Sequence, residues 1–181
     1  KHVSKIKKSI NNLTDILNDF LSVSKLEEGK MENMPVEINL KIFIADILAE
    51  MQSMATDGQK LIYEHSGSET VSIDKKLLKN VLFNLISNAI KFSPEGGKVE
   101  VTAQVLNASI KISVKDNGIG ISKEDQKHLF ERFFRGQNAT HIQGTGLGLN
   151  IVTKYAELMN GSLDFESKEN KGTTFTVIIP Q

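Results

Sequence analysis

The sequence predicts an α+β domain: a two-layer α/β sandwich whose mixed sheet is covered by helices on one face, preceded by a long N-terminal helix. Three observations support this prediction. Segments with helical and strand periodicity follow one another without the strict alternation that builds a parallel α/β fold. The chain has 181 residues, which suits one domain with a modest extension. Hydrophobic residues make up 39% of it, which is ample for a core.

The first segment, residues 1–26, is predicted to be a helix. Its apolar residues recur every three or four positions, which marks one helix face: Ile6, Ile10, Leu13, Leu17 and Phe20. Gly29 is suited to end this helix, and Pro35 stops any continuation. Because no second helix follows nearby in sequence, we expect the stripe to pack against another chain or a missing helix. The alternative is packing on the domain's own surface.

The remaining elements follow from periodicity and from turn residues. Asp74 is a suitable N-cap for the strongest helix, and Pro94 opens the turn that closes it. The stretch after Arg135 is rich in glycine and polar residues, so we predict a mobile loop that orders around its ligand. In chain order we predict a strand at 36–40, a helix at 42–54, a strand at 60–65, a helix from 72–74 to 92, strands at 98–105 and 108–114 joined as a hairpin near Asn107, a helix at 123–134, the loop at 135–146, a helix at about 145–159, and strands at 162–167 and 173–179.

Composition excludes several kinds of function. Lys and Arg together number 22, as do Asp and Glu, so no net basic field attracts nucleic acid or an anionic membrane. The absence of cysteine excludes disulfides, thiolate zinc sites and cysteine nucleophiles, and the four histidines are too scattered to suggest a metal cluster. No apolar run approaches the roughly 20 residues that span a bilayer. We therefore expect a soluble fragment of a longer protein, with any sensor or membrane segment upstream.

Asn84 and Asn88 lie four residues apart in an apolar helical run, so both amides share one helix face. A side-chain carbonyl oxygen suits Mg²⁺ and an amide NH₂ can donate to phosphate, so the pair can hold a metal-nucleotide complex without adding negative charge. The alternative is a structural pair of hydrogen-bonded amides inside a packed helix. The motifs downstream decide between the two.

Asp116 ends a predicted strand and is followed by a tight turn that contains Gly118 and Gly120. A carboxylate at this point can accept a hydrogen bond from an exocyclic amine such as that of adenine, and the glycines let a flat ring approach the backbone. The alternative is a solvated turn aspartate, which is common in Asp-Asn-Gly sequences.

A glycine-rich segment opens the helix that follows the loop: Gly144-Thr145-Gly146-Leu147-Gly148. Free N–H groups and the dipole at a helix start favour a phosphate. The dinucleotide-binding motif GxGxxG does not fit, because the spacing here is GxGxG and a polar loop precedes it. The P-loop motif also fails, because Met31 follows Gly29-Lys30 and no glycine stands at the required distance before it.

Two cations are candidates for phosphate contacts. Arg135 follows an aromatic segment that includes Phe133 and stands at the edge of the loop, where a guanidinium can pair with a terminal phosphate. Lys91 lies three residues beyond Asn88 on the same helix face. The alternatives are that the aromatics only anchor the loop in the core and that the lysine is solvated.

These motifs, in this order, resemble those of the catalytic, ATP-binding domain of sensor histidine kinases, which has the Bergerat fold shared with gyrase-type ATPases. The resemblance covers about residues 36–180. Residues 84–91 resemble the N box, 116–120 the first glycine box, 130–134 the F box and 144–149 the second glycine box. Residues 1–30 resemble the second helix of the dimerisation and phosphoacceptor hairpin, which divides the chain into this partial hairpin and a catalytic domain at 31–181.

The resemblance implies ATP and Mg²⁺ as ligands. Asp116 would recognise adenine, the asparagine pair would organise Mg²⁺ and the phosphates, and the two cations would contact phosphate. The implied catalytic set is Asn84, Lys91 and Arg135, and the implied nucleotide-binding set adds Asn88, Asp116, Gly118, Gly120, Phe133, Gly144, Thr145, Gly146, Leu147 and Gly148. The family reaction passes the γ-phosphoryl of ATP to a histidine and then to an aspartate of a response regulator. Phosphoryl transfer needs mainly positioning and charge neutralisation, which these groups supply.

Two departures from the family pattern refine this expectation. In hydrolytic relatives, the position four before the metal-binding asparagine is a glutamate that acts as general base. Here it is Asn84, which cannot take a proton from water, so transfer to histidine is favoured over hydrolysis. The phosphoacceptor signature, a His followed by Glu or Asp and then Arg-Thr-Pro, occurs nowhere in the chain, and His2 lacks that context. We therefore expect ATP binding without efficient self-phosphorylation.

The implied partners are a response-regulator receiver domain and a second copy of the chain, joined through the N-terminal hairpin of the full-length protein. We expect no nucleic acid partner and no direct membrane contact by this fragment, which the resemblance places in the cytoplasm whether or not the parent protein is anchored in the inner membrane. Two alternative functions stay open: a non-catalytic nucleotide-sensing and dimerisation module, and a serine kinase or ATPase on the same fold. Asn84 opposes the ATPase, and the hairpin-like first helix opposes the serine kinase.

Overall fold

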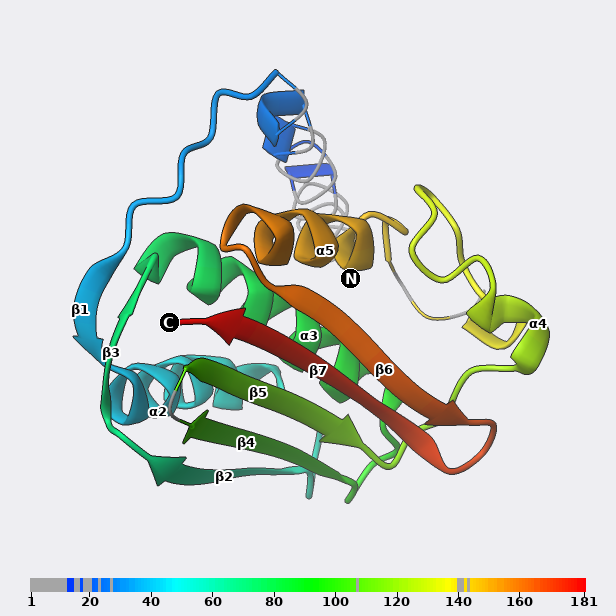
Figure 1. Ribbon diagram of the computed structural model, residues 1–181. Helices are drawn as coiled ribbons and strands as arrows, with labels where there is room; N and C mark the ends of the chain where they lie inside the picture. The colour runs from blue at the N-terminus through cyan, green and yellow to red at the C-terminus, as the bar shows by residue number, and fades with distance from the viewer. Residues whose placement is uncertain are drawn as a thin grey trace.

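The computed structural model describes residues 13–14, 17, 21–22, 24–26, 28–106, 108–139, 142 and 144–181. Figure 1 shows a large sheet with helices packed beside it. The strand order is β2-β4-β5-β7-β6, in which β2 and β4 are parallel and the other neighbours are antiparallel, so the sheet is mixed as predicted. The strands are β2 (Lys60–Gly67), β4 (Lys98–Leu106), β5 (Ser109–Asp116), β6 (Ser162–Lys168) and β7 (Gly172–Pro180).

One face of this sheet is covered by helices. Alternate residues of the three central strands are buried, as Val99, Ile112 and Val177 illustrate, and this is the pattern of a sheet with one face on the core. The helices that contact the sheet are α2 (Leu40–Met51), α3 (Lys75–Phe92) and α5 (Gly148–Leu158). The two-layer α+β arrangement confirms the predicted fold class.

Helix α3 carries the asparagine pair. Asp74 caps its start, because Oδ1 accepts hydrogen bonds from the backbone N–H groups of Lys76 and Leu77 at 2.8 and 2.9 Å. At the other end Ser93 is extended, and Pro94 follows it. The buried face consists of Leu77, Leu78, Val81, Leu82, Leu85, Ile86, Ala89 and Ile90. Burial of this stripe leaves the face with the asparagine pair beside α5.

A second, two-stranded sheet joins the N-terminal part of the chain to α3. Strand β1 (Val36–Asn39) pairs antiparallel with β3 (Thr70–Ile73). The assignment of Ser72 and Ile73 to the helix start is wrong: both belong to β3. Pairing with β1 sets this strand, and local sequence does not separate it from the helix start that follows directly at Asp74.

The predicted helix at 123–134 is much shorter in the structure, where α4 spans only Lys123–Gln126. The chain then continues as separate turns, such as the one closed by the 3.1 Å bond from His128 N–H to Asp125 O. Phe133 has a φ of 61°, a left-handed conformation that a helix interior does not allow. Its N–H bonds to the carbonyl of Gly146 at 3.0 Å. The aromatic residues have a helical spacing in the sequence, but in the structure they belong to a turn that packs against the glycine segment.

Helix α5 starts at Gly148, slightly later than predicted. Thr145 Oγ1 accepts a 3.1 Å bond from Leu147 N–H, and Gly146 has a φ of 73°. The helical conformation can therefore begin only after Gly146. The predicted end is confirmed, because Asn160 has a φ of 56° and the next residue donates back to the last turn.

The described residues between 13 and 26 are helical, and Gly29 ends this helix as predicted, with a φ of 63° and a 3.1 Å bond from Lys30 N–H to Lys25 O. Leu13 and Leu17 of the predicted stripe are 68% and 55% exposed, so these two side chains do not pack on the domain. The other predicted stripe residues, Ile6, Ile10 and Phe20, and the predicted hairpin turn at Asn107 lie outside the described residues. Within the described part of the chain, no helix has the length and apolar content needed to cross a membrane.

Candidate functional site

A cavity of about 470 Å³ opens between α3, the turn after β5, α4, the loop after α4 and the start of α5. Figure 1 shows α4, this loop and the start of α5 at the same end of the molecule. The four sequence motifs therefore meet around one space. The predicted site residues that line it are Asn84, Asn88, Lys91, Asp116, Gly120, Arg135, Gly144, Thr145, Gly146 and Gly148.

The polar side chains of α3 form one wall of the cavity. Asn84 Nδ2 donates to the carbonyl of Asn80 at 3.0 Å, one turn earlier in the helix. Its Oδ1 faces Gly148, where an added Cβ would approach it to 2.7 Å, so glycine at the start of α5 leaves room for the Asn84 amide in this position. The side chains of Asn88 and Lys91 make no hydrogen bond or ion pair with any residue that the structure describes. Both are therefore open toward the cavity.

Asp116, at the end of β5, also lines the cavity and is only 6% exposed. Its Oδ1 accepts hydrogen bonds from the backbone N–H groups of Gly118, at 2.8 Å, and Thr173, at 3.2 Å. No described residue bonds to Oδ2, so this oxygen is free for a ligand. Burial raises the pKa of Asp116, and the two backbone hydrogen bonds oppose that rise.

The turn after Asp116 is held against neighbouring backbone, which explains its glycines. A Cβ on Gly118 would lie 2.2 Å from the carbonyl oxygen of Phe92, and one on Gly120 would lie 2.1 Å from that of Lys168. Gly120 also has a φ of 64°. Because neither position admits a side chain, the carboxylate of Asp116 is held in place by backbone alone.

Three predicted site residues do not line the cavity. Gly118 lies under Asp116, where its role is the backbone bond just described. Leu147 is 1% exposed and belongs to the hydrophobic core. Phe133 is 64% exposed. An added Cβ on Gly146 would approach its backbone to 2.6 Å, so Phe133 braces the glycine segment through its main chain and not through its ring.

The loop after α4 closes over the cavity through bonds that sequence reasoning missed. Arg135 Nη2 donates to the carbonyls of Ala139, at 3.0 Å, and Ile142, so the guanidinium braces its own loop. Asn138 Nδ2 donates to the carbonyl of Gly120 at 3.2 Å. The sequence offered no signal for this contact, because it depends on how the loop folds back. The predicted mobility of residues 135–146 stays a prediction.

A second missed residue is Asp125, a carboxylate that lines the cavity and is 8% exposed. Its Oδ2 accepts a 3.2 Å bond from the backbone N–H of Gln137. The available signal was the Ser122-x-x-Asp125 spacing of a helix start, and Ser122 Oγ does accept the N–H of Asp125 at 3.1 Å. That signal indicates a cap and says nothing of a cavity.

The comparisons with known proteins agree with this arrangement. The model of the family described as histidine kinase-, DNA gyrase B-, and HSP90-like ATPases matches residues 73–181. The chain is 35% identical over 178 residues to the histidine protein kinase DivJ of Caulobacter vibrioides, which covers 97% of this chain and 30% of that protein. It is 33% identical over 174 residues to the sensor-like histidine kinase SenX3 of Mycobacterium tuberculosis, covering 94% of this chain and 42% of that protein.

Solved structures show the same relationship. Full-length ShkA in complex with AMPPNP superposes with a TM-score of 0.86 at 26% identity, covering 99% of this chain and 38% of that one. The histidine kinase ThkA in complex with the response regulator protein TrrA gives a TM-score of 0.75 at 26% identity, covering 99% and 50%.

The family model covers more than half of the chain, so the chain belongs to the histidine kinase-, DNA gyrase B- and HSP90-like ATPases. Within that family, these two relatives are histidine kinases, and this confirms the resemblance seen in the sequence. The chain spans less than half of the length of both curated relatives.

Proposed function

We propose that the cavity binds ATP with Mg²⁺ and that the chain is the catalytic part of a sensor histidine kinase. It would transfer the γ-phosphoryl of ATP to a histidine in a phosphoacceptor signature that this sequence does not contain, for relay to a response-regulator aspartate. The observation that carries the proposal is a set of polar groups around one space that have no partner in the described part of the chain: the side chains of Asn88 and Lys91, and Oδ2 of Asp116.

Each of these groups suits one part of the nucleotide. Oδ2 of Asp116 is a buried acceptor for the exocyclic amine of adenine. The ammonium of Lys91 lies three residues beyond Asn88 on the same face of α3, where it can neutralise phosphate charge. Purine and triphosphate would thus lie against different walls of the cavity.

The asparagine pair fits a magnesium ion in the chemistry of its donors. Asn84 commits its NH₂ to the carbonyl of Asn80, which leaves its oxygen as the group that faces the cavity. The side-chain amide of Asn88 has no partner among the described residues. Mg²⁺ prefers oxygen ligands and keeps several of its waters, so two neutral amide oxygens and the phosphates are a plausible set. When bound, the ion would neutralise charge on the phosphates.

Arg135 would have to exchange partners to contact phosphate. Its guanidinium now bonds to the carbonyls of Ala139 and Ile142 in the same loop. A phosphate group is a stronger partner for guanidinium than a neutral carbonyl, because both are charged and the pairing can be bidentate. Nucleotide binding would therefore release the loop from Arg135 and reorganise it.

The chemistry that remains for the protein is positioning. Asn84 stands where hydrolytic relatives carry a general base, and a neutral amide cannot accept a proton from water. A neutral imidazole needs no such base to attack phosphorus. The site therefore favours a histidine acceptor over water.

We further propose that residues 1–30 are the second helix of a dimerisation hairpin and that 31–181 form the catalytic domain. The described helical residues that end at Gly29, with Leu13 and Leu17 exposed, support this division. The complex of ThkA with TrrA supports a response-regulator receiver domain as a partner of the whole protein.

The direct test is calorimetry of ATP binding to this chain with and without Mg²⁺, followed by phosphotransfer in a longer chain that restores the upstream hairpin helix. We expect Mg²⁺-dependent ATP binding by the chain and acid-labile phosphohistidine only in the longer protein. Binding without phosphohistidine in the longer protein would favour the nucleotide-sensing module instead. Rapid labelling of this chain alone by γ-labelled ATP would contradict the missing acceptor.

A further inference from the structure

The cavity holds a second buried carboxylate whose acceptor capacity is only half used. Asp125 is 8% exposed, and its Oδ2 accepts the N–H of Gln137 at 3.2 Å. No residue that the structure describes bonds to Oδ1, although Asp125 lines the cavity. A buried polar group without a partner is costly, so a carboxylate oxygen left open toward a cavity points to a donor supplied from that cavity.

The bonds around Asp125 place it near the glycine turn that follows Asp116. Gln137, which bonds to Asp125, precedes Asn138, and Asn138 donates to the carbonyl of Gly120 at 3.2 Å. An added Cβ on Gly136 would lie 2.9 Å from Oδ2 of Asp125, so the loop passes directly against this carboxylate. Asp125 therefore shares its neighbourhood with the adenine-binding turn.

The negative charge of Asp125 also favours the nucleoside end of the ligand over the triphosphate end. A carboxylate beside the triphosphate would face like charges in a partly desolvated space, which is unfavourable. The groups proposed to hold the phosphates are Lys91 and Asn88 on α3 and, after its partners are exchanged, Arg135 in the loop. None of these side chains bonds to Asp125 in the structure. Asp125 is thus suited to the nucleoside part of the ligand.

The nucleoside of ATP offers donors at the exocyclic amine and at the 2′ and 3′ hydroxyls. The amine is the group for which Asp116 is suited. We propose that Oδ1 of Asp125 accepts a hydrogen bond from a ribose hydroxyl, which makes Asp125 a specificity-determining residue for ribonucleotides. This inference rests on the proposed function, because it needs ATP in this cavity.

Ligand analogues test the inference in the unaltered chain. We expect calorimetry with Mg²⁺ to show that 2′-deoxy-ATP or 3′-deoxy-ATP binds about tenfold more weakly than ATP, because a hydrogen bond to a buried charged acceptor is lost. Equal affinity for ATP and both analogues would overturn the inference and leave the proposed function standing. Failure of ATP itself to bind would overturn both.

Variants then assign the discrimination to Asp125. Asp125→Asn keeps an oxygen for Gln137 but turns the charge-assisted bond into a neutral one, so discrimination against the deoxynucleotide should fall to about threefold. Asp125→Ala should abolish it. Glu124→Gln removes the same charge from the neighbouring, exposed position and should keep the tenfold preference. Full discrimination in Asp125→Asn and Asp125→Ala would show that Asp125 only anchors the loop.

Discussion

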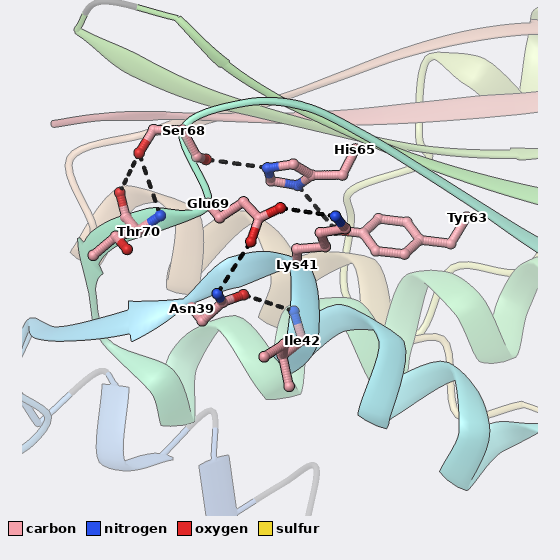
Figure 2. Close-up of polar contacts among 8 residues, drawn as sticks. All are labelled: Asn39, Lys41, Ile42, Tyr63, His65, Ser68, Glu69 and Thr70. Atoms are coloured by element: carbon pink, nitrogen blue, oxygen red, sulfur yellow. Dashed lines mark hydrogen bonds and ion pairs between the residues drawn. The ribbon is translucent and has the colours of Figure 1, made fainter.

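Polar side chains at two ends of the molecule differ in whether the protein completes their hydrogen bonds. At the corner where β1 leads into α2, which we call the connector corner, Figure 2 shows the side chains bonded to one another. Glu69 accepts from Lys41 Nζ at 2.7 Å and from Asn39 Nδ2 at 3.4 Å. His65 lies between the hydroxyl of Tyr63 and a backbone carbonyl, at 3.1 Å from each. In the cavity, Asn88, Lys91 and one oxygen of Asp116 have no such partner among the described residues.

The difference separates structural from functional polarity. The connector corner fixes backbone: Asn39 Oδ1 caps α2 through the N–H of Ile42 at 2.9 Å, and the carbonyl of Glu69 accepts the N–H of Leu40 at 2.7 Å. Completed networks of this kind define one conformation. The side chains of Asn88 and Lys91 and Oδ2 of Asp116 hold no other described part of the protein, so the cost of leaving them without partners is recovered only when a ligand binds. Loss of a cavity group should therefore affect binding, and loss of a connector group should affect folding.

The largest effect on ATP binding is expected from substitution of Asp116. Asp116→Asn can keep both backbone bonds through its oxygen, but its NH₂ then faces the exocyclic amine of adenine, donor against donor. We expect ATP affinity in calorimetry to fall by about 100-fold, the cost of an unpaired buried polar group together with a lost charge-assisted bond. The control is Asp164→Asn on the exposed position of β6, which should bind ATP as the unaltered chain does. A similar loss in both variants would mean that the effect is one of overall charge.

Asp74 provides the opposite case, a carboxylate whose acceptors are used for structure. Its Oδ1 caps α3, and its Oδ2 accepts the N–H of Met34 at 2.9 Å, which ties the segment after the N-terminal helix to the helix that carries Asn84 and Asn88. Asp74→Ala loses both, so we expect the free energy of unfolding in urea to fall by about 2–3 kcal/mol.

The Asp74→Asn variant separates the cap of α3 from the bond to Met34. It caps a helix as well as aspartate does, but its NH₂ cannot accept the N–H of Met34, so the expected loss is only about 1 kcal/mol. Hydrogen exchange should show faster exchange of the Met34 amide in Asp74→Asn while the first turn of α3 stays protected. Equal losses of stability in the two variants would show that the bond to Met34 contributes nothing.

The same division explains what the sequence could predict. The amphipathic face of α3, its Asp74 cap and the Asn160 helix end depend on local spacing, so they were correct. Asp116, with its glycines, was recognisable because the turn allows few other residues. The contacts of Asp125 with Gln137 and of Asn138 with Gly120 could not be found, because they join residues 12 and 18 positions apart and depend on the loop folding back. The prediction of a helix through Phe133 was wrong for the same reason, because its turn is set by contact with Gly146.

A smaller effect is expected at Gly148, where the two kinds of role meet. Alanine is a better helix former than glycine, but its Cβ would approach Oδ1 of Asn84 to 2.7 Å and push the amide from its position. We expect Gly148→Ala to weaken Mg²⁺-dependent ATP binding about tenfold while the unfolding midpoint in urea changes little. Lys154→Ala on the exposed face of the same helix is the control, because it also introduces alanine into α5 but does not line the cavity. A large fall in stability with unchanged binding would assign Gly148 to the fold and not to the site.

The smallest effect is expected at the connector corner, where the ion pair of Glu69 with Lys41 is solvent-exposed. The hydrogen bond from Lys41, followed by that from Asn39, lowers the pKa of Glu69. Because the folded pKa lies below the unfolded one, the contribution of Glu69 to stability is present above the unfolded pKa and is lost as the pH falls through the folded pKa.

In an NMR titration we expect Lys41→Met to raise the pKa of Glu69 toward its ordinary value, whereas Lys168→Met, on the far edge strand β6, should leave it unchanged. ATP affinity should be the same in both variants, since neither residue lines the cavity. A change in ATP affinity with Lys41→Met alone would show that the connector corner and the cavity are coupled, and the separation between structural and functional polarity would then fail at this corner.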